Sequence, residues 1–191
     1  MENQILHALR ITLITFLISL VVTISFKFAL SIWISVVILI IVILTGILFD
    51  IVGTAVTAAK EAPFHAMGAD RVKGSREAIY LVRHADQVAN FCNDVIGDIA
   101  GTISGALIVS IILQSFGNIM QLQLDFFSAV GIAFIAACTV GGKALGKRFA
   151  IEQANEIVII VGKVLSFLKI LKGNQRRKQK NKYRQKGQKR S

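Results

Sequence analysis

Two uncharged apolar runs near the N-terminus constrain the fold of this 191-residue chain more than any other feature. Residues 11–26 and 28–49 carry no charged side chain, are rich in Ile, Leu, Val and Phe, and are separated only by Lys27. Apolar runs of this length without strand-like alternation are typical of membrane-spanning helices. We therefore expect a tight hairpin of two spans at the start of an all-α integral membrane protein.

Two further apolar stretches complete the predicted bundle. Residues 99–124 are uncharged, and residues 126–142 form another uncharged run that ends at Lys143. We predict four transmembrane helices over residues 10–27, 29–58, 92–114 and 126–144. Short amphipathic surface helices within 60–90 and a juxtamembrane helix over 149–172 complete a membrane domain of residues 1–172. A fifth span in place of the juxtamembrane helix is disfavoured, because it would carry the basic tail across the membrane.

The basic residues are distributed unevenly. They collect near the N-terminus, within residues 60–86 and after residue 143, whereas the connection near residue 118 has none. The positive-inside rule then places both termini in the cytoplasm of a multi-pass protein in the cell (inner) membrane. Ten of the 22 Lys and Arg lie between Lys172 and Arg190, without an acidic residue. We expect residues 173–191 to be a disordered tail beside anionic lipid, with RNA contact as the weaker alternative.

The sequence contains no pattern typical of an enzyme. Cys92 and Cys138 fall in or at the edge of apolar helices, and the three histidines are scattered. Cys/His metal spacing, a Gly-rich phosphate loop and a nucleophile–base pattern are all missing from the sequence. We therefore expect no catalysis and no bound cofactor.

Carboxylates at membrane depth form the candidate functional site, since charge is costly there. Asp50 lies in the second predicted span, whereas Asn93, Asp94 and Asp98 lie at the start of the third. Thr54 adds a hydroxyl one helical turn beyond Asp50. Oxygen ligands of this kind suit a hard cation such as Mg²⁺.

The carboxylates also have structural explanations. Asp94 and Asp98 can cap the start of a helix, where the helix dipole favours negative charge. Asp50 can form an internal ion pair with Lys143, which a four-span topology places at the same level. An ion site and a structural pair therefore both remain open at Asp50.

Glycines follow these carboxylates at four-residue spacing. On an α-helix, Gly101 and Gly105 project to nearly the same side as Asp94 and Asp98, and Gly97 continues the four-residue spacing of the glycines. Small residues at this spacing let another helix approach closely. The series predicts helix packing, with a passage for the ion or a dimer seam as the alternatives.

Three segments carry a family resemblance. They are LFDIVGTA at 48–55, CNDVIGD at 92–98 and GKALGKRFAIEQANEIV at 142–158. In order and spacing they resemble the FFSxSExA, GNxxxN and GEIIPK motifs of the transmembrane domain of the cyclin-M/CorC family of magnesium transport proteins, over residues 30–172. The resemblance implies a homodimer that holds a dehydrated Mg²⁺ between Ser, Asn and Glu side chains and couples transport to Na⁺.

The match differs from the family at most ligand positions. By position, Asp50 and Val52 stand at the family's serines, Gly53 at its glutamate, and Asn93 and Gly97 at its asparagines. Only Asn93 is retained, and Lys143 replaces the glutamate of GEIIPK. Asp50 and Asp98 bring carboxylates at or beside positions where the family has neutral ligands. Compared with the family, we also expect an extra first helix and no paired CBS domains after the juxtamembrane helix.

Two functions follow from these observations. The first is divalent-cation (Mg²⁺ or Co²⁺) transport by a homodimer in the lipid bilayer, with Asp50, Asn93 and Asp98 as ligands and with Na⁺-coupled efflux implied by the resemblance. The second is a non-transporting scaffold or accessory protein, in which Asp50 pairs with Lys143 and the basic tail binds a partner or anionic lipid. Nucleic acid is not expected as a partner.

Overall fold

The computed structural model describes residues 12–13, 16–17, 20, 31–116 and 121–169, and this part of the chain is all-helical. The first predicted span, residues 10–27, lies mostly outside the described residues, and the predicted tail over 173–191 lies wholly outside them. The elements are α2 (Ile32–Ala58), α3 (Glu61–Ala69), α4 (Ser75–Arg83), α5 (Ala85–Asn90), the π-helix η1 (Phe91–Ile96), α6 (Gly97–Phe116) and α7 (Gln121–Glu152). A further helix covers residues 154–169 and is called the 154–169 helix below.

Three of these helices are long and apolar enough to cross a membrane. They cover Ile32–Ala58, Ala85–Phe116 and Leu122–Glu152, with 27, 32 and 31 residues. At about 1.5 Å of rise per residue, each exceeds the roughly 30 Å thickness of a bilayer's hydrocarbon core. They correspond to the second, third and fourth predicted spans. The all-α expectation is confirmed for the described residues, and three of the four predicted spans are present as helices that could cross a membrane.

The helices of the third and fourth spans extend further than their predicted bounds. The third span was expected over 92–114, but α5, η1 and α6 form one helix from Ala85 to Phe116. The fourth was expected to end at residue 144, but α7 continues to Glu152, and the next helix begins at residue 154 instead of 149. The uncharged run marks the part suited to lipid, whereas the backbone of α7 continues as a helix through Lys143, Lys147 and Arg148 because Lys and Arg are good helix formers.

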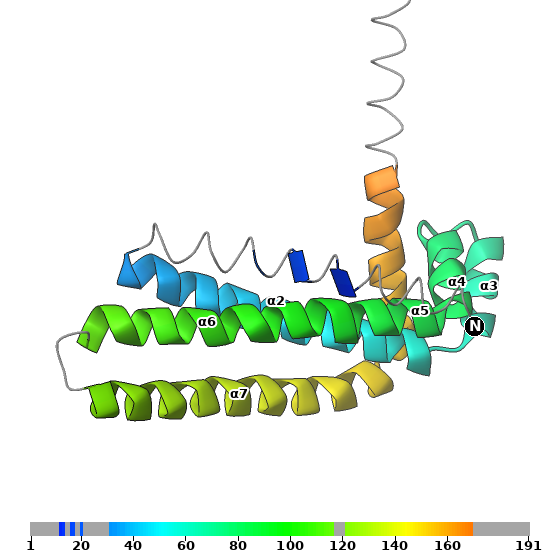
Figure 1. Ribbon diagram of the computed structural model, residues 1–191. Helices are drawn as coiled ribbons and strands as arrows, with labels where there is room; N and C mark the ends of the chain where they lie inside the picture. The colour runs from blue at the N-terminus through cyan, green and yellow to red at the C-terminus, as the bar shows by residue number, and fades with distance from the viewer. Residues whose placement is uncertain (1–11, 14–15, 18–19, 21–30, 117–120, 170–191) are drawn as a thin grey trace, which may run out of the picture.

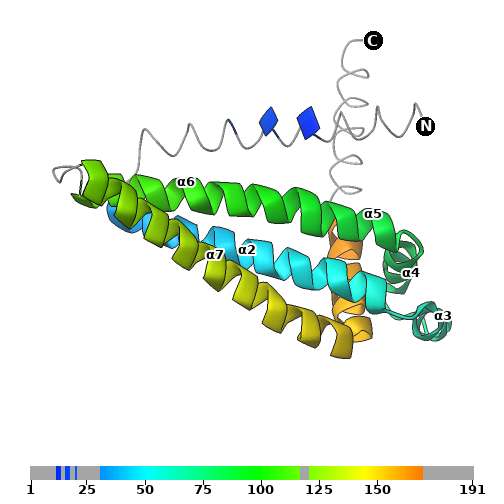
Figure 2. The ribbon, with the colours of Figure 1, turned by 60° about the horizontal axis from the view of Figure 1, so that its bottom comes forward.

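The long helices pack side by side, and the short ones gather at one end. Figures 1 and 2 show α2, α6 and α7 as a bundle, with α3, α4 and the 154–169 helix at the end opposite to the start of α7. We call this the basic end, because its segments contain Lys60, Arg71, Lys73, Arg76, Arg83, Lys147, Arg148, Lys163 and Lys169. No Lys or Arg occurs in the sequence between residues 84 and 142, which includes the opposite end.

The bundle has apolar side chains both inside and outside. Leu39, Ile103 and Leu107 are buried between the long helices. Trp33 and Phe134, on the outer surface of α2 and α7, are 82% and 65% exposed. A surface this apolar is unfavourable in water, so it supports a lipid environment for the bundle.

Glycines of α7 receive side chains from α2. A Cβ on Gly142 would lie 2.5 Å from Cδ1 of Ile47, and a Cβ on Gly146 would lie 2.7 Å from Cγ1 of Ile51. Two isoleucines therefore insert where α7 has no side chain. Close packing against small residues is a common means of association between membrane helices.

The predicted glycine series of α6 does not pack in this way. Apart from the nearby backbone of α6 itself, no atom of the described chain lies within 4 Å of a Cβ built on Gly101 or Gly105. At Gly97 the nearest atom is Nζ of Lys143, 3.1 Å from the Cβ position. The series thus borders open space and a lysine, so the packing interpretation is wrong for the described part of the chain.

The basic end has a core of its own. Phe64 of α3, Ala78 of α4 and Val158 of the 154–169 helix are fully buried in one cluster. Burial of these apolar side chains joins the predicted surface helices and the juxtamembrane helix into one packed unit. Ile160 and Phe167 of the 154–169 helix remain exposed, which leaves one side of this unit apolar.

The 154–169 helix contacts α4 through the backbone. Gly74, which precedes α4, has a left-handed φ of +87°, and a Cβ on it would lie 2.5 Å from the backbone nitrogen of Lys163. A Cβ on Gly162 would overlap with the carbonyl oxygen of Gly74 and lie 3.1 Å from the backbone nitrogen of Ala78. Neither glycine has room for a larger residue.

Two polar contacts reinforce this packing. Nζ of Lys169 donates a hydrogen bond of 3.1 Å to Oε1 of Glu77 on α4. The backbone N–H of Lys60, between α2 and α3, donates to Oδ1 of Asn155 at 3.1 Å. The 154–169 helix is thereby connected to both neighbouring parts of the basic end.

Glu61 gives the basic end a weak acid sensitivity. Its Oε1 lies 2.7 Å from Nε2 of His65 and accepts a hydrogen bond of 2.7 Å from Nε of Arg83. These two hydrogen bonds, with that of His65 the larger cause, lower the pKa of Glu61 below its usual 4.5. A carboxyl whose pKa is lowered by folding stabilises the folded state above its usual pKa, and this contribution is lost as the pH falls through the lowered value.

We therefore expect the melting temperature of the parent to fall as the pH drops below 4.5 and the Glu61→Gln variant to show a shallower fall. Thermal melts from about pH 6 to about pH 3 measure this difference. The effect is small because the carboxyl is exposed to solvent. Glu156→Gln, at an exposed glutamate, serves as the control. Parallel pH profiles for the parent and Glu61→Gln would contradict the assignment.

Candidate functional site

Asp50 is the buried carboxylate of the bundle. It lies on α2, and the residue is 4% exposed. Its Oδ1 is 3.8 Å from Nζ of Lys143 on α7, which is close enough for charge attraction but longer than a hydrogen bond. Its Oδ2 is buried and has no hydrogen-bond partner within the described residues. Asp50 is therefore neutralised by a neighbour but incompletely satisfied.

Asn93 lies across from α2, within the π-helix η1. Its Oδ1 is also buried without a hydrogen-bond partner in the described part of the chain. We call Oδ2 of Asp50 and Oδ1 of Asn93 the two open oxygens. Single π-turns inside α-helices are frequent at functional sites.

Gly53 makes the position of Asn93 sterically feasible. A Cβ on Gly53 would overlap with Oδ1 of Asn93 and lie 3.1 Å from Cβ of Cys92. Gly53 follows Asp50 by three residues, so the two share one side of α2. The side of α2 that carries Asp50 is therefore the side that receives the amide of Asn93.

Lys143 completes the junction from the third helix. Its side chain is 23% exposed, and Nζ lies beside the position that a Cβ of Gly97 would occupy. α2, the η1–α6 segment and α7 thus each contribute to one place, which we call the junction site: Asp50, Gly53, Asn93, Gly97 and Lys143. The glycines at 53 and 97 leave space, and the other three residues supply polar groups.

A groove of about 490 Å³ leads away from the junction site along α6 and α7. Gly97, Gly101 and Gly105 line it, together with Asp98 and Lys143. Thr102, Ser104 and Thr139 add hydroxyl groups to the lining. The open space beside the glycine series is therefore a polar-edged groove that Lys143 borders.

The structure brings together only some of the predicted ligands. Asp98 is exposed in the groove, Asp94 is exposed and is not among the groove-lining residues, and Thr54 is half-buried on α2. The hydroxyl of Thr57 donates to the backbone oxygen of Thr54 at 2.8 Å. No group of three or more His, Cys, Asp or Glu that is suited to a metal ion occurs among the described residues.

The oxygen atoms available at the junction site limit the kind of cation that can bind there. The junction site offers one carboxylate and one amide oxygen, with an ammonium group 3.8 Å from the carboxylate. Mg²⁺ prefers octahedral oxygen coordination with carboxylates and retained waters. An ion at Asp50 would therefore need water or a rearrangement of Lys143 to complete its coordination.

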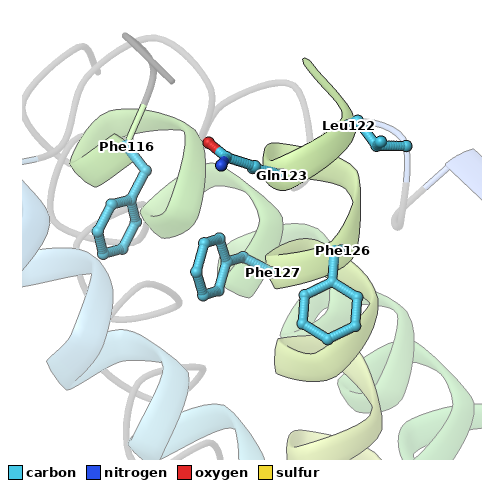
Figure 3. A pocket seen from close by; sticks show the side chains of 5 residues that line it. All are labelled: Phe116, Leu122, Gln123, Phe126 and Phe127. Carbon is cyan, nitrogen blue, oxygen red and sulfur yellow. The ribbon is translucent and has the colours of Figure 1, made fainter. Parts of the chain in front are cut away.

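A second cavity lies at the opposite end of the bundle. It measures about 570 Å³ and is lined by Phe116, Leu122, Gln123, Phe126 and Phe127 (Figure 3). The rings of Phe116 and Phe127 stack with centroids 5.6 Å apart. The lining contains no charged side chain, so this cavity is not a candidate cation site.

Sequence reasoning identified Asp50, Asn93 and Lys143 but missed the role of Gly53. The position of Gly53, one turn beyond Asp50 and at the same membrane level as Asn93, is the sequence signal that could have indicated this role. The π-helix had no sequence signal that we recognised.

In its described part this chain is all-helical, and three of its helices are long and apolar enough to cross a membrane, which suggests a multi-pass membrane protein. Comparison of the chain with protein-family models, with curated proteins and with solved structures finds no match.

Proposed function

We propose that this protein transports a cation across the membrane and that the junction site binds the ion. The observation that supports the proposal is the pair of open oxygens, buried where three candidate spans meet. A buried acceptor left unsatisfied costs about 1–3 kcal/mol. Binding a partially hydrated cation would remove this cost at Asp50 and Asn93 together.

The groove supports a path for the ion. Asp98 and the hydroxyl groups of the groove offer further oxygen ligands between the junction site and the surface of the bundle. Ionisable residues inside a membrane bundle commonly mark ion pathways. Within this proposal Asp50 and Asn93 bind the ion, and Asp98 guides it.

The resemblance to the cyclin-M/CorC family suggests the ion. It favours Mg²⁺ or Co²⁺ as the cargo, with Na⁺ as the coupling ion. The same resemblance suggests a homodimer, and the open side of Gly101 and Gly105 is a suitable contact for a second copy.

The charge distribution suggests the orientation. Because basic residues collect at the basic end, the positive-inside rule places this end in the cytoplasm. With the predicted first span over residues 10–27, both termini would then be cytoplasmic. A bacterial inner membrane fits the composition.

Ion flux into proteoliposomes tests this function. We expect protein-dependent flux of Mg²⁺, Co²⁺ or Na⁺ that falls at least about tenfold in Asp50→Asn, because the site loses its buried charge, an effect of about 1.4 kcal/mol or more. Asp94→Asn, which removes a nearby but exposed carboxylate, serves as the matched control and should retain flux.

A thermal melt of the detergent-purified protein provides the binding measurement. A ligand that binds only the folded state raises the stability by about 2.7 kcal/mol at 100 times its dissociation constant. Saturable stabilisation by one ion in the parent, lost in Asp50→Asn, is expected. Absence of flux for all tested cations, from protein that is folded, would reject the transport function.

One observation favours the second function, a non-transporting scaffold. Lys143 already neutralises Asp50, so the pair can be purely structural. In that case no cation stabilises the parent, and Asp50→Asn is less stable in every buffer. The basic tail beyond the described residues would then be the part that binds a partner or anionic lipid.

A further inference from the structure

The contact between Lys143 and Asp50 is loose. Nζ of Lys143 is 3.8 Å from Oδ1 of Asp50, beyond hydrogen-bonding distance, while the other carboxylate oxygen is one of the two open oxygens. A structural ion pair buried in a membrane bundle is expected to form short hydrogen bonds that compensate for desolvation. Lys143 therefore neutralises Asp50 without being fixed to it.

The side chain of Lys143 has space to move away from Asp50. Lys143 lines both the junction site and the groove of about 490 Å³, and Gly97 leaves space beside its ammonium group. The carboxylate of Asp98 and the hydroxyl of Thr102 also line this groove. Its four-carbon stem is flexible, so the ammonium can leave Asp50 for the groove without movement of the backbone.

Charge balance then links the lysine to the ion. With Lys143 in place, the formal charges of the junction site sum to zero. A cation that enters while the ammonium stays would be repelled, and a divalent ion would be repelled twice as strongly as a monovalent one at the same distance. Displacement of the ammonium into the groove weakens this repulsion by increasing the distance between the charges, and the part that remains is twice as large for a divalent ion.

We infer that Lys143 is a tethered competitor of the transported cation at Asp50 and that it disfavours divalent relative to monovalent cations. This inference rests on the proposed function, since it requires a cation to bind at the junction site. It assigns Lys143 the role of a specificity-determining residue: the ammonium occupies the carboxylate when the ion is absent and moves into the groove when the ion binds.

The test titrates detergent-purified protein separately with NaCl and MgCl₂, using choline chloride to hold the ionic strength constant, and follows the melting temperature. Lys143→Gln removes the competitor. We expect the half-saturating concentration to fall about tenfold for Na⁺ and by a larger factor, up to about 100-fold, for Mg²⁺, because the repulsion that remains after displacement is twice as large for the divalent ion. The larger gain for Mg²⁺ is the signature of the inference.

Two further variants sharpen the test. Lys147→Gln removes the same charge from an exposed position one turn further along α7 and should change either concentration by less than about twofold, since exposed charges are screened. Lys143→Arg keeps the charge and adds a planar group that can bind a carboxylate through two hydrogen bonds. It should therefore compete more strongly and raise both half-saturating concentrations, which also tests the inference if Lys143→Gln fails to fold.

The outcomes separate the inference from the proposed function. If the parent binds cations and folded Lys143→Gln binds them equally or more weakly, the inference is overturned and the transport function stands. Unchanged binding in Lys143→Arg would also overturn it. Equal gains for Na⁺ and Mg²⁺ would overturn the charge preference. If neither ion stabilises the parent or Lys143→Gln, both the inference and the proposed function fail.

Discussion

Asp50→Lys is expected to prevent this protein from folding stably. The substitution places a second ammonium beside Lys143, whose Nζ is 3.8 Å from the carboxylate in the parent. Leaving one partner of a buried ion pair uncompensated costs about 3–5 kcal/mol, and a like charge in its place costs more. Most membrane proteins cannot lose this much stability, so we expect little monodisperse protein on size-exclusion chromatography after extraction.

The reciprocal change should restore folding in part. In the double variant Asp50→Lys with Lys143→Asp, opposite charges face each other again, and a double-mutant cycle isolates their interaction. Asp94→Lys is the matched control, because Asp94 is exposed and a surface substitution typically changes stability by less than about 0.5 kcal/mol. Normal folding of Asp50→Lys would contradict the contact between α2 and α7. If the double variant fails to fold, as Asp50→Lys is expected to, the local geometry does not tolerate the exchange of the two side chains.

Gly162→Ala is expected to separate the 154–169 helix from α4. The added Cβ would overlap with the carbonyl oxygen of Gly74, and backbone atoms cannot move aside as the end of a flexible side chain can. Overpacking of this kind costs about 1–3 kcal/mol and occasionally more. We expect a lower melting temperature and faster proteolysis within the basic end.

Gly101→Ala provides the matched control for this change. Both glycines lie within helices, but no described atom outside the nearby backbone of α6 lies within 4 Å of a Cβ on Gly101. Ala is favoured over Gly in a helix interior by about 1 kcal/mol, so this variant should be as stable as the parent or more stable. A loss of stability in Gly101→Ala would indicate that another helix, such as that of a second copy, packs there. Equal melting temperatures for Gly162→Ala and the parent would contradict the backbone contact.

Much of the fold could be predicted from the sequence because lipid imposes a strong local constraint. Uncharged apolar runs located the three candidate spans of the described part, and the distribution of Lys and Arg indicated which ends lie together. The bounds were less accurate: the helix predicted to begin at residue 92 begins at Ala85. Hydropathy records where a helix suits lipid, whereas backbone hydrogen bonds determine where it ends.

The candidate site was predictable only in its parts. Asp50 and Asn93 were recognised because polar groups at membrane depth are costly. Lys143 was considered as a partner for Asp50, but the sequence alone did not decide between an ion pair and an ion site. The sequence predicts Asp98 as a ligand beside Asp50, yet Asp98 lies exposed in the groove, because the rotation of a helix about its axis is set by its neighbours.

The sequence by itself determined the class of protein and the level of each polar residue along its helix, because apolar length and charge position are properties of one segment. Only the tertiary structure decided which side chains of different helices face one another. It brought Lys143 to Asp50 across 93 residues of chain, placed the amide of Asn93 against Gly53, and left Gly101 beside open space within the described chain. These contacts depend on how three helices are rotated against one another, and that rotation follows from side-chain packing between segments distant in the sequence.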